Sequence, residues 1–122
     1  MALRIPGRGR SRRRRSQALP DSPLEAEIAG EIMRTLRALS FDVSSTQQTR
    51  ASRQTVGMPD LYVSHEAWRV RCWIEVKRPG ERPTPAQHAW HNRERAAGGI
   101  VLVCTSAMDA LTQINRLRVR TG

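Results

Sequence analysis

The stretch that decides the fold is VRCWIEVK, which occupies residues 70–77. Successive side chains of a β-strand point to opposite faces, so every second residue shares a face. One face of this stretch is wholly apolar, whereas the other carries Glu75 and Lys77. We therefore predict a strand that packs one face on a core and projects a carboxylate and an ammonium group together from the other.

A second strand is predicted just upstream, over residues 60–64, and residues 65–69 join the two strands as a β-hairpin. Asp60 begins this second strand, on the face opposite its apolar residues. If the hairpin pairs in register, Asp60 lies at the same end of the sheet as Glu75 and Lys77. The hairpin thus predicts two carboxylates and one lysine in a single cluster.

An amphipathic helix is predicted over residues 24–39, where apolar residues recur at helical spacing. Ser22 and Glu25 have the spacing of a capping box at its start. At about 100° per residue, Glu25 lies roughly 40° from the centre of the apolar stripe and Glu31 roughly 80°. Glu25 is therefore the first candidate to reach the carboxylate pair from this helix, and Glu31 is the alternative.

The remaining segments complete an α/β pattern. We predict a strand over residues 41–49, a helix over 84–97 that stops at two glycines, a covered strand over 100–104 and a last helix over 108–119. The resulting order, α-β-β-β-α-β-α, predicts a central mixed β-sheet flanked by helices.

The charge is concentrated at one end of the chain. The 122 residues include 21 basic and 11 acidic side chains, which gives a formal charge of +10, and Lys77 is the only lysine among them. Residues 1–20 hold seven arginines and no acid. We predict a disordered basic arm over residues 1–23 and a single domain over residues 24–122. A polycationic arm favours a polyanionic partner.

Several classes of protein are disfavoured. The sequence has no apolar run near the roughly 20 residues that span a bilayer, and no hydrophobic leader follows Met1. We expect no membrane partner, and a cytoplasmic location in a bacterium or a phage-infected host cell, or a nuclear one in a eukaryote. Cys72 and Cys104 lie in apolar stretches and are expected to be buried thiols rather than a disulfide or zinc ligands.

The acidic cluster suggests a particular chemistry. Carboxylates that share a pocket repel each other, and a divalent cation relieves that repulsion. Mg²⁺ prefers hard oxygen ligands, acidifies bound water and neutralises charge on phosphate oxygens. A lysine orients such a water better than an arginine, which hardly gives up a proton. The alternative for Glu75 and Lys77, taken alone, is a solvated ion pair on an edge strand.

Four segments together resemble the VRR-NUC family of the PD-(D/E)xK nuclease superfamily. They are Glu25 before the amphipathic helix, GMPDL at 57–61, WIEVK at 73–77 and TPAQ at 84–87. The resemblance covers about residues 24–112. It departs at Ser40, where the family usually has a glycine after the first helix.

The resemblance implies a restriction-endonuclease-like fold that depends on Mg²⁺ or Mn²⁺. It also implies similarity to small standalone Holliday-junction-resolvase-like proteins, which often act as homodimers. By position it assigns Asp60, Glu75 and Glu25 as metal ligands with the carbonyl of Val76, Lys77 as the residue that positions the attacking water, and Gln87 as a support from its helix.

Further residues are candidates for contacts with DNA or for the hydrophobic core. Predicted phosphate contacts, with solvated loop charge as the alternative, are Arg12, Arg13, Arg14, Arg15, Arg50, Arg53, Arg78 and Arg82. The three tryptophans are candidates for stacking on bases, although Trp90 is expected in the core and Trp73 either in packing or in the wall of the site. His88 and His91 are expected at the surface.

We therefore predict a metal-dependent DNA endonuclease that hydrolyses phosphodiester bonds and selects branched DNA such as a Holliday junction or a flap. The alternative is a non-catalytic nucleic-acid-binding module that uses the same fold and the basic arm. Asp60, Glu75 and Lys77 together favour the enzyme, because simple binding needs no acidic cluster facing phosphate.

Overall fold

The structure, a computed structural model, describes residues 21–46 and 56–121. Residues 1–20 of the predicted arm, the end of the strand predicted over residues 41–49 and six of the predicted DNA contacts lie outside the described residues, whereas residues 21–23 of the predicted arm form the start of the first helix. Those six are Arg12, Arg13, Arg14, Arg15, Arg50 and Arg53.

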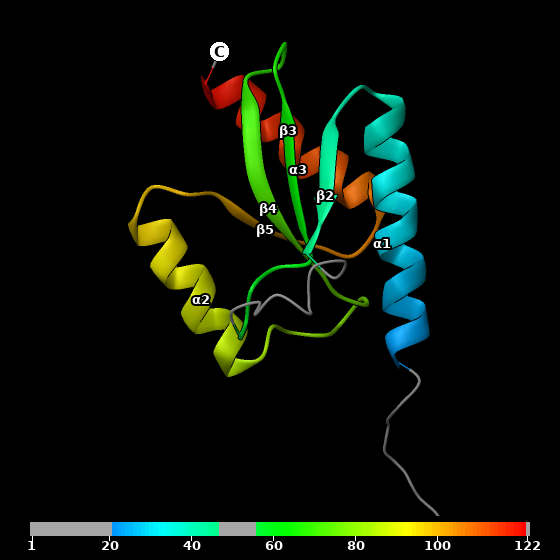
Figure 1. The fold of residues 1–122 in the computed structure, drawn as a ribbon, viewed down its shortest axis with the longest axis vertical. Helices are drawn as coiled ribbons and strands as arrows, with labels where there is room; N and C mark the ends of the chain where they lie inside the picture. Colours follow the sequence, from blue (N-terminus) through cyan, green and yellow to red (C-terminus); the bar gives the residue numbers. More distant parts are fainter. Residues whose placement is uncertain (1–20, 47–55, 122) are drawn as a thin grey trace, which may run out of the picture.

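A four-stranded mixed sheet forms the centre of the fold, in the order β2-β3-β4-β5 (Figure 1). Antiparallel pairing joins β3 to both β2 and β4, whereas β5 runs parallel to β4. A parallel pair needs a long crossover connection, and the helix α2 lies in that connection. The strands are β2 (Asp42–Ser45), β3 (Leu61–His65), β4 (Val70–Val76) and β5 (Val101–Cys104), and the crossover helix is α2 (Pro85–Ala96).

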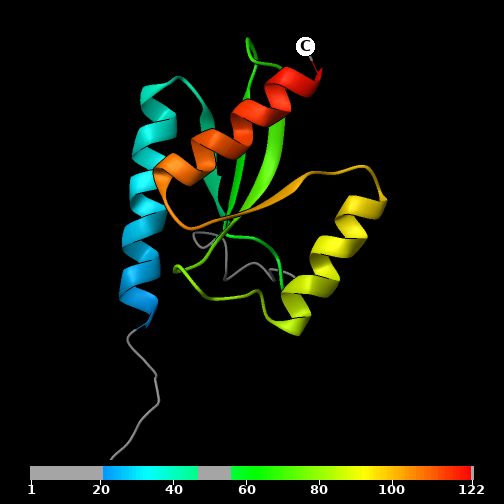
Figure 2. The same ribbon diagram turned by 180° about the vertical axis from the view of Figure 1, so that it is seen from behind.

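Helices α1 (Asp21–Ala38) and α3 (Ala107–Thr121) pack against each other and against the sheet. In Figure 2, α3 passes in front of the strands with α1 beside it, while α2 stands apart from both. The core between these two helices and the sheet includes the alternate residues Val70, Cys72, Ile74 and Val76 of β4. The predicted α-β-β-β-α-β-α order and the apolar face of β4 are therefore confirmed.

The first helix differs from its prediction at both ends. It begins at Asp21, so Ser22 lies inside the helix and is not its cap. It ends at Ala38, and both Leu24 and Leu39 are about 40% exposed, at 42% and 40%. Figure 1 shows the first turns of α1 extending past the ends of the strands, which leaves these turns without a core to cover. Only the middle of the predicted stripe, with Ile32 and Leu36, is fully buried.

The turn after α1 explains the departure at Ser40. The N–H of Ser40 donates to the carbonyl of Arg37 and that of Phe41 to the carbonyl of Leu36, each at 3.0 Å. This is the Schellman pattern, in which the residue after the C-cap adopts the left-handed conformation that glycine prefers. Ser40 has a φ of +74°, so a serine adopts here the left-handed conformation that glycine usually occupies.

We expect Ser40→Gly to stabilise the protein by about 1 kcal/mol, because it removes the clash of the serine Cβ in a left-handed conformation. Thermal unfolding should show Tm higher by about 4–8 °C. The matched control is Ser44→Gly in the middle of β2, where glycine weakens a strand and should lower Tm. An unchanged or lower Tm for Ser40→Gly would contradict this explanation of the turn.

The expectation of buried free thiols is confirmed in the part of the chain that the structure describes. Cys72 and Cys104 are free and buried, and burial raises the pKa of the Cys72 thiol to about 12 and that of Cys104 as well. Among the described helices, none is long and apolar enough to cross a membrane.

Candidate active site

The β3–β4 hairpin brings three predicted site residues to one end of the sheet. Leu61 pairs with Ile74, which sets Asp60 beside the end of β4. One carboxylate oxygen of Asp60, Oδ2, accepts a hydrogen bond from the backbone N–H of Val76 at 2.8 Å. Asp60 also raises the pKa of Glu75, through its negative charge and through a hydrogen bond between the two side chains. The in-register prediction for this hairpin is therefore confirmed.

Glu75 and Lys77 are buried, at 2% and 7% exposure. Burial is the largest cause that raises the pKa of Glu75, to about 9, and the charge of Lys77 opposes the rise. The alternative of a solvated ion pair on an edge strand is wrong, because β4 lies between β3 and β5 and water reaches neither side chain freely. Burying a carboxyl and an ammonium group is costly unless they are paired or bind a ligand.

The helix α2 supplies two contacts to Glu75. Thr84 caps the helix in a capping box with Gln87, whose Oε1 accepts from the Thr84 N–H at 2.8 Å. The other end of the same amide, Nε2, donates to Glu75 Oε2 at 3.0 Å. His91 Nε2 lies 3.4 Å from Glu75 Oε1. The predicted support from Gln87 is thus present as a contact.

The surface expectation for His91 is wrong, although His88 is exposed as expected. His91 is only 1% exposed, because it faces Glu75 across the gap between α2 and the sheet. Burial lowers its pKa, and the positive charge of Arg95 lowers it further, which favours a neutral ring. A signal was available in the sequence, since Gln87 and His91 have the i, i+4 spacing that puts both on one helix face.

The carboxyl group of Glu25, and not that of Glu31, reaches this cluster. Glu25 is half-buried on the first turns of α1, whereas Glu31 is exposed. Burial raises the pKa of Glu25 to about 7, a hydrogen bond with Glu81 raises it too, and the charge of Lys77 lowers it. Glu25, the first candidate by its angle to the apolar stripe, is therefore the glutamate of α1 that lies near the site.

Glu81 was not predicted, and it lies in the loop between β4 and α2. Both of its carboxylate oxygens accept hydrogen bonds from Arg78, and the closest, from Nη2, is 2.7 Å long. These bonds hold the pKa of Glu81 at about 2. Arg78 is thus tied to Glu81, while Arg82 in the same loop is exposed. A loop without periodicity gives no sequence signal for the approach of Glu81 to Glu25.

The loop that carries Asp60 touches the start of α2 through backbone alone. Gly57 has a φ of +89°, and a Cβ added to it would overlap the backbone carbonyl of Ala86. A glycine at residue 57 therefore allows Asp60 and Gln87, on separate elements, to approach Glu75 from two sides.

We expect Gly57→Ala to destabilise the fold by about 2 kcal/mol or more, because the new methyl group meets backbone that cannot move cheaply and φ is strained. Gly80→Ala is a matched control: Gly80 has a similar φ of +87°, but open space surrounds the position of its Cβ. Comparing the free energies of unfolding of the two variants in urea separates the effect of the contact with Ala86 from the effect of the strained φ. An equal loss of stability in the two variants would show that the contact with Ala86 contributes nothing.

The donor set fits a hard divalent cation. Asp60 and Glu75 offer carboxylate oxygens at one point, the carbonyl of Val76 lies next to Glu75 along the strand, and the mutual repulsion of the carboxylates favours a positive ion. Mg²⁺ is commonly bound by one or two carboxylates and keeps several waters. Within residues 21–46 and 56–121, no three His, Cys, Asp or Glu side chains form a metal-binding group by themselves. A cation here would therefore take further ligands from backbone, water or phosphate.

A mixed sheet with an aspartate, a glutamate and a lysine at the end of its central hairpin is the arrangement of a nuclease domain of the restriction-endonuclease-like superfamily. Residues 12–108 match the family model described as VRR-NUC domain, and the chain belongs to this family. The match begins at residue 12, inside the segment predicted as an arm. Neither the curated proteins nor the solved structures contain a match to the chain.

Proposed function

We propose that this protein is a Mg²⁺- or Mn²⁺-dependent endonuclease that hydrolyses phosphodiester bonds in DNA. The observation that carries the proposal is the burial of Glu75 and Lys77 next to Asp60 at one end of the sheet. A surface that only binds nucleic acid gains nothing from carboxylates that face phosphate, and burying them costs free energy. Their presence is explained if they act in catalysis.

Each residue of the cluster has a role in this proposal. Asp60 and Glu75, with the carbonyl of Val76, would hold the cation, and Glu25 would add negative charge from α1. When bound, the cation supplies positive charge to the phosphate oxygens and lowers the pKa of water. Lys77 would hold the attacking water in line, and its positive charge would stabilise the hydroxide that forms when a solvent water accepts the proton. Gln87 and the neutral His91 fix the carboxylate of Glu75.

We further propose branched DNA, a Holliday junction or a flap, as the substrate and a homodimer as the active form. The support is the resemblance of the site motifs to small junction-resolving nucleases. A two-fold dimer also presents two sites to the two strands of a junction. DNA as the substrate fits a cytoplasmic location in a bacterium or a phage-infected cell, or a nuclear one in a eukaryote.

The test incubates the purified protein with linear duplex, flap and four-way-junction DNA in Mg²⁺, Mn²⁺ or EDTA. Cleavage in either metal and none in EDTA is expected, and Asp60→Asn should remove it. Asp42→Asn is the matched control, because Asp42 is exposed at the opposite end of the sheet, where it pairs with Ser64. Nicking that survives Asp60→Asn would rule out this site, and tight binding without cleavage would favour the non-catalytic module.

The arginines outside the cluster are proposed as sequence-independent phosphate contacts. They are Arg12, Arg13, Arg14, Arg15, Arg50, Arg53, Arg78 and Arg82. A chain that starts at Pro20 should bind DNA more weakly, and its plot of log K against log salt should be shallower by about 0.9 for each phosphate that the arm neutralises in the full chain. Fluorescence anisotropy at several salt concentrations measures that slope. An unchanged slope would refute a role for the arm.

A further inference from the structure

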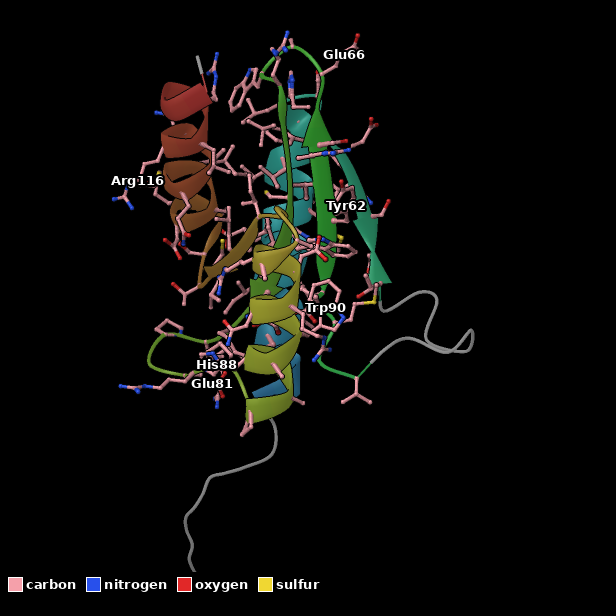
Figure 3. All side chains as sticks on the ribbon, turned by 90° about the vertical axis from the view of Figure 1, so that its left-hand side faces the viewer. Tyr62, Glu66, Glu81, His88, Trp90 and Arg116 are labelled. Atoms are coloured by element: carbon pink, nitrogen blue, oxygen red, sulfur yellow. The ribbon has the colours of Figure 1, made fainter. Side chains whose placement is uncertain are left out.

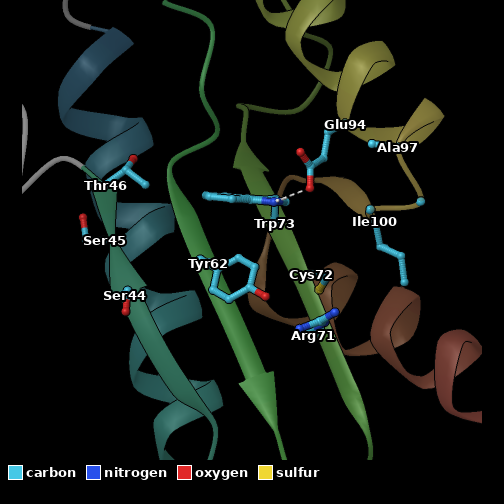
Figure 4. A pocket seen from close by; sticks show the side chains of 12 residues that line it. Ser44, Ser45, Thr46, Tyr62, Arg71, Cys72, Trp73, Glu94, Ala97 and Ile100 are labelled. Atoms are coloured by element: carbon cyan, nitrogen blue, oxygen red, sulfur yellow. Dashed lines mark hydrogen bonds between the residues drawn. The ribbon is translucent and has the colours of Figure 1, made fainter. Parts of the chain in front are cut away.

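We propose that a pocket beside the candidate active site binds one unpaired base of the DNA substrate, an inference that rests on the proposed function for its choice of DNA. The pocket has a volume of about 630 Å³, and Tyr62 and Trp73 are among the side chains that line it (Figure 4). Because Trp73 and Glu75 are two residues apart on β4, the pocket lies on the face of the sheet that carries Glu75. Residues of strands β2, β3 and β4 line it, together with Thr46, Glu94 of α2 and residues 97–100. We call it the aromatic pocket, after Tyr62 and Trp73. Its volume is within the range typical of small-ligand sites, about 300–1,000 Å³.

Two aromatic rings form its floor. Tyr62 on β3 is paired with Trp73 on β4, and their ring centroids lie 4.7 Å apart with 59° between the ring planes. Both side chains are half-buried, so the sheet supports them while part of each remains accessible from the pocket. Aromatic rings of this kind bind unstacked bases in single-stranded nucleic acid, since every base offers a π-face.

The indole of Trp73 is held in place before any ligand binds. Its Nε1 donates to Glu94 Oε2 at 3.1 Å, and Trp90 packs edge-on against it with centroids 5.2 Å apart. Figure 3 shows Trp90 leaving the side of α2 toward the sheet, where Tyr62 lies on β3. Trp90 is half-buried rather than in the core, where it was expected. A ring that is already fixed loses little conformational entropy when a base stacks on it.

The position of the pocket fits a nucleotide next to the cleaved bond. Trp73 and Glu75 lie two residues apart on one face of β4, which places them about 7 Å from each other. Because successive nucleotides of a stacked strand rise about 3.4 Å, the ring lies one or two nucleotides from a phosphate at Glu75. Arg71, two residues further along the same face, adds a positive charge at the pocket for a neighbouring phosphate.

A pocket that binds one unpaired base also suits branched DNA, the proposed substrate. Branched DNA has unpaired or easily unpaired bases next to the branch, whereas a linear duplex keeps its bases stacked and out of reach. A pocket for one base beside the cleavage site would therefore favour a branch over a continuous duplex.

The test measures binding to a duplex that carries one unpaired 2-aminopurine nucleotide, and to the same duplex with an abasic site there, in EDTA. The unaltered protein should bind the first DNA about 5- to 150-fold more tightly, the range expected for one base stacked on aromatic side chains. Stacking should also quench the fluorescence of the 2-aminopurine. Tyr62→Leu should lose the preference, and Tyr62→Phe, the matched control, should keep it.

Equal affinity of the unaltered protein for the two DNAs would overturn the proposal, and this comparison decides it even if Tyr62→Leu fails to fold. Displacement of the DNA by a similar concentration of free deoxyadenosine monophosphate would also overturn it, in favour of a free-nucleotide pocket. Base preference without any cleavage in Mg²⁺ or Mn²⁺ would refute the nuclease proposal but support the pocket. Cleavage that depends on Asp60 without base preference would refute the pocket alone.

Discussion

Lys77→Ala is expected to lower the rate of DNA cleavage by about 10²- to 10⁴-fold, the usual contribution of a group that positions a proton transfer or stabilises charge in the transition state. The reason is that Lys77 is the buried cation next to Asp60 and Glu75, where it lowers the pKa of Glu75. Single-turnover cleavage of the preferred branched DNA measures the effect. DNA binding should change little, because one buried ammonium group adds little to a chain of charge +10.

Two variants control for the loss of side-chain packing and of charge. Lys77→Met keeps the aliphatic stem, so it should be folded and as inactive as Lys77→Ala. Lys77→Arg keeps the charge but replaces a compact ammonium group with a wide planar one that cannot hold the water in the same place, and it should also lose most activity. Full activity in Lys77→Arg would show that this position supplies charge alone and would contradict the proposed role in holding the water.

Glu75→Gln is expected to abolish cleavage and yet to stabilise the metal-free protein at alkaline pH. The pKa of Glu75 is raised from 4.5 to about 9 in the folded protein, so folding favours the protonated form. The stability that this group contributes is fully present below pH about 4.5 and is lost as the pH rises toward about 9, at up to about 1.4 kcal/mol for each pH unit. An uncharged amide at residue 75 avoids that loss.

Thermal unfolding is measured in EDTA from pH 5 to 9, the range between the ordinary and the raised pKa of Glu75. The Tm of the unaltered protein should fall across this range, and the Tm of Glu75→Gln should fall less. Adding Mn²⁺ at about pH 8 should raise the Tm of the unaltered protein and leave that of the variant nearly unchanged. Glu66→Gln, an exposed glutamate in the β3–β4 turn, is the matched control. Parallel pH profiles for Glu75→Gln and the unaltered protein would contradict a raised pKa of Glu75 in the folded protein.

The hairpin and the carboxylate cluster could be predicted because they depend on local periodicity. The alternation in residues 70–77 determined which side chains share a face, and the offset between Asp60 and Glu75 set their meeting point once the strands paired. The helical angle of Glu25 distinguished it from Glu31, because burial on a helix follows the angle to the apolar stripe. The departure at Ser40 was also visible, although only the hydrogen bonds of the turn explain why glycine is preferred there.

The contacts of α2 could not be predicted in the same way. Its inward face meets a polar part of the sheet, so His91, its one buried residue, is polar and no apolar stripe marks that face. An expectation based on hydrophobicity therefore placed His91 outside and Trp90 inside. The approach of Glu81 to Glu25 joins a loop to a helix distant in sequence, and no periodic pattern encodes such a contact.

Gln87 connects the cap of a helix to the buried carboxyl group of Glu75, so changes at the two places are not independent. In most capping boxes glutamate and glutamine are interchangeable at this position, since only an acceptor is needed. Here the oxygen of the amide accepts from Thr84 and its nitrogen donates to Glu75, so both ends of one group are committed. Glutamate would preserve the helix end but would direct a second negative charge at Glu75. Gln87→Glu is therefore the substitution that the end of the helix tolerates best, and it is also the one that this site excludes.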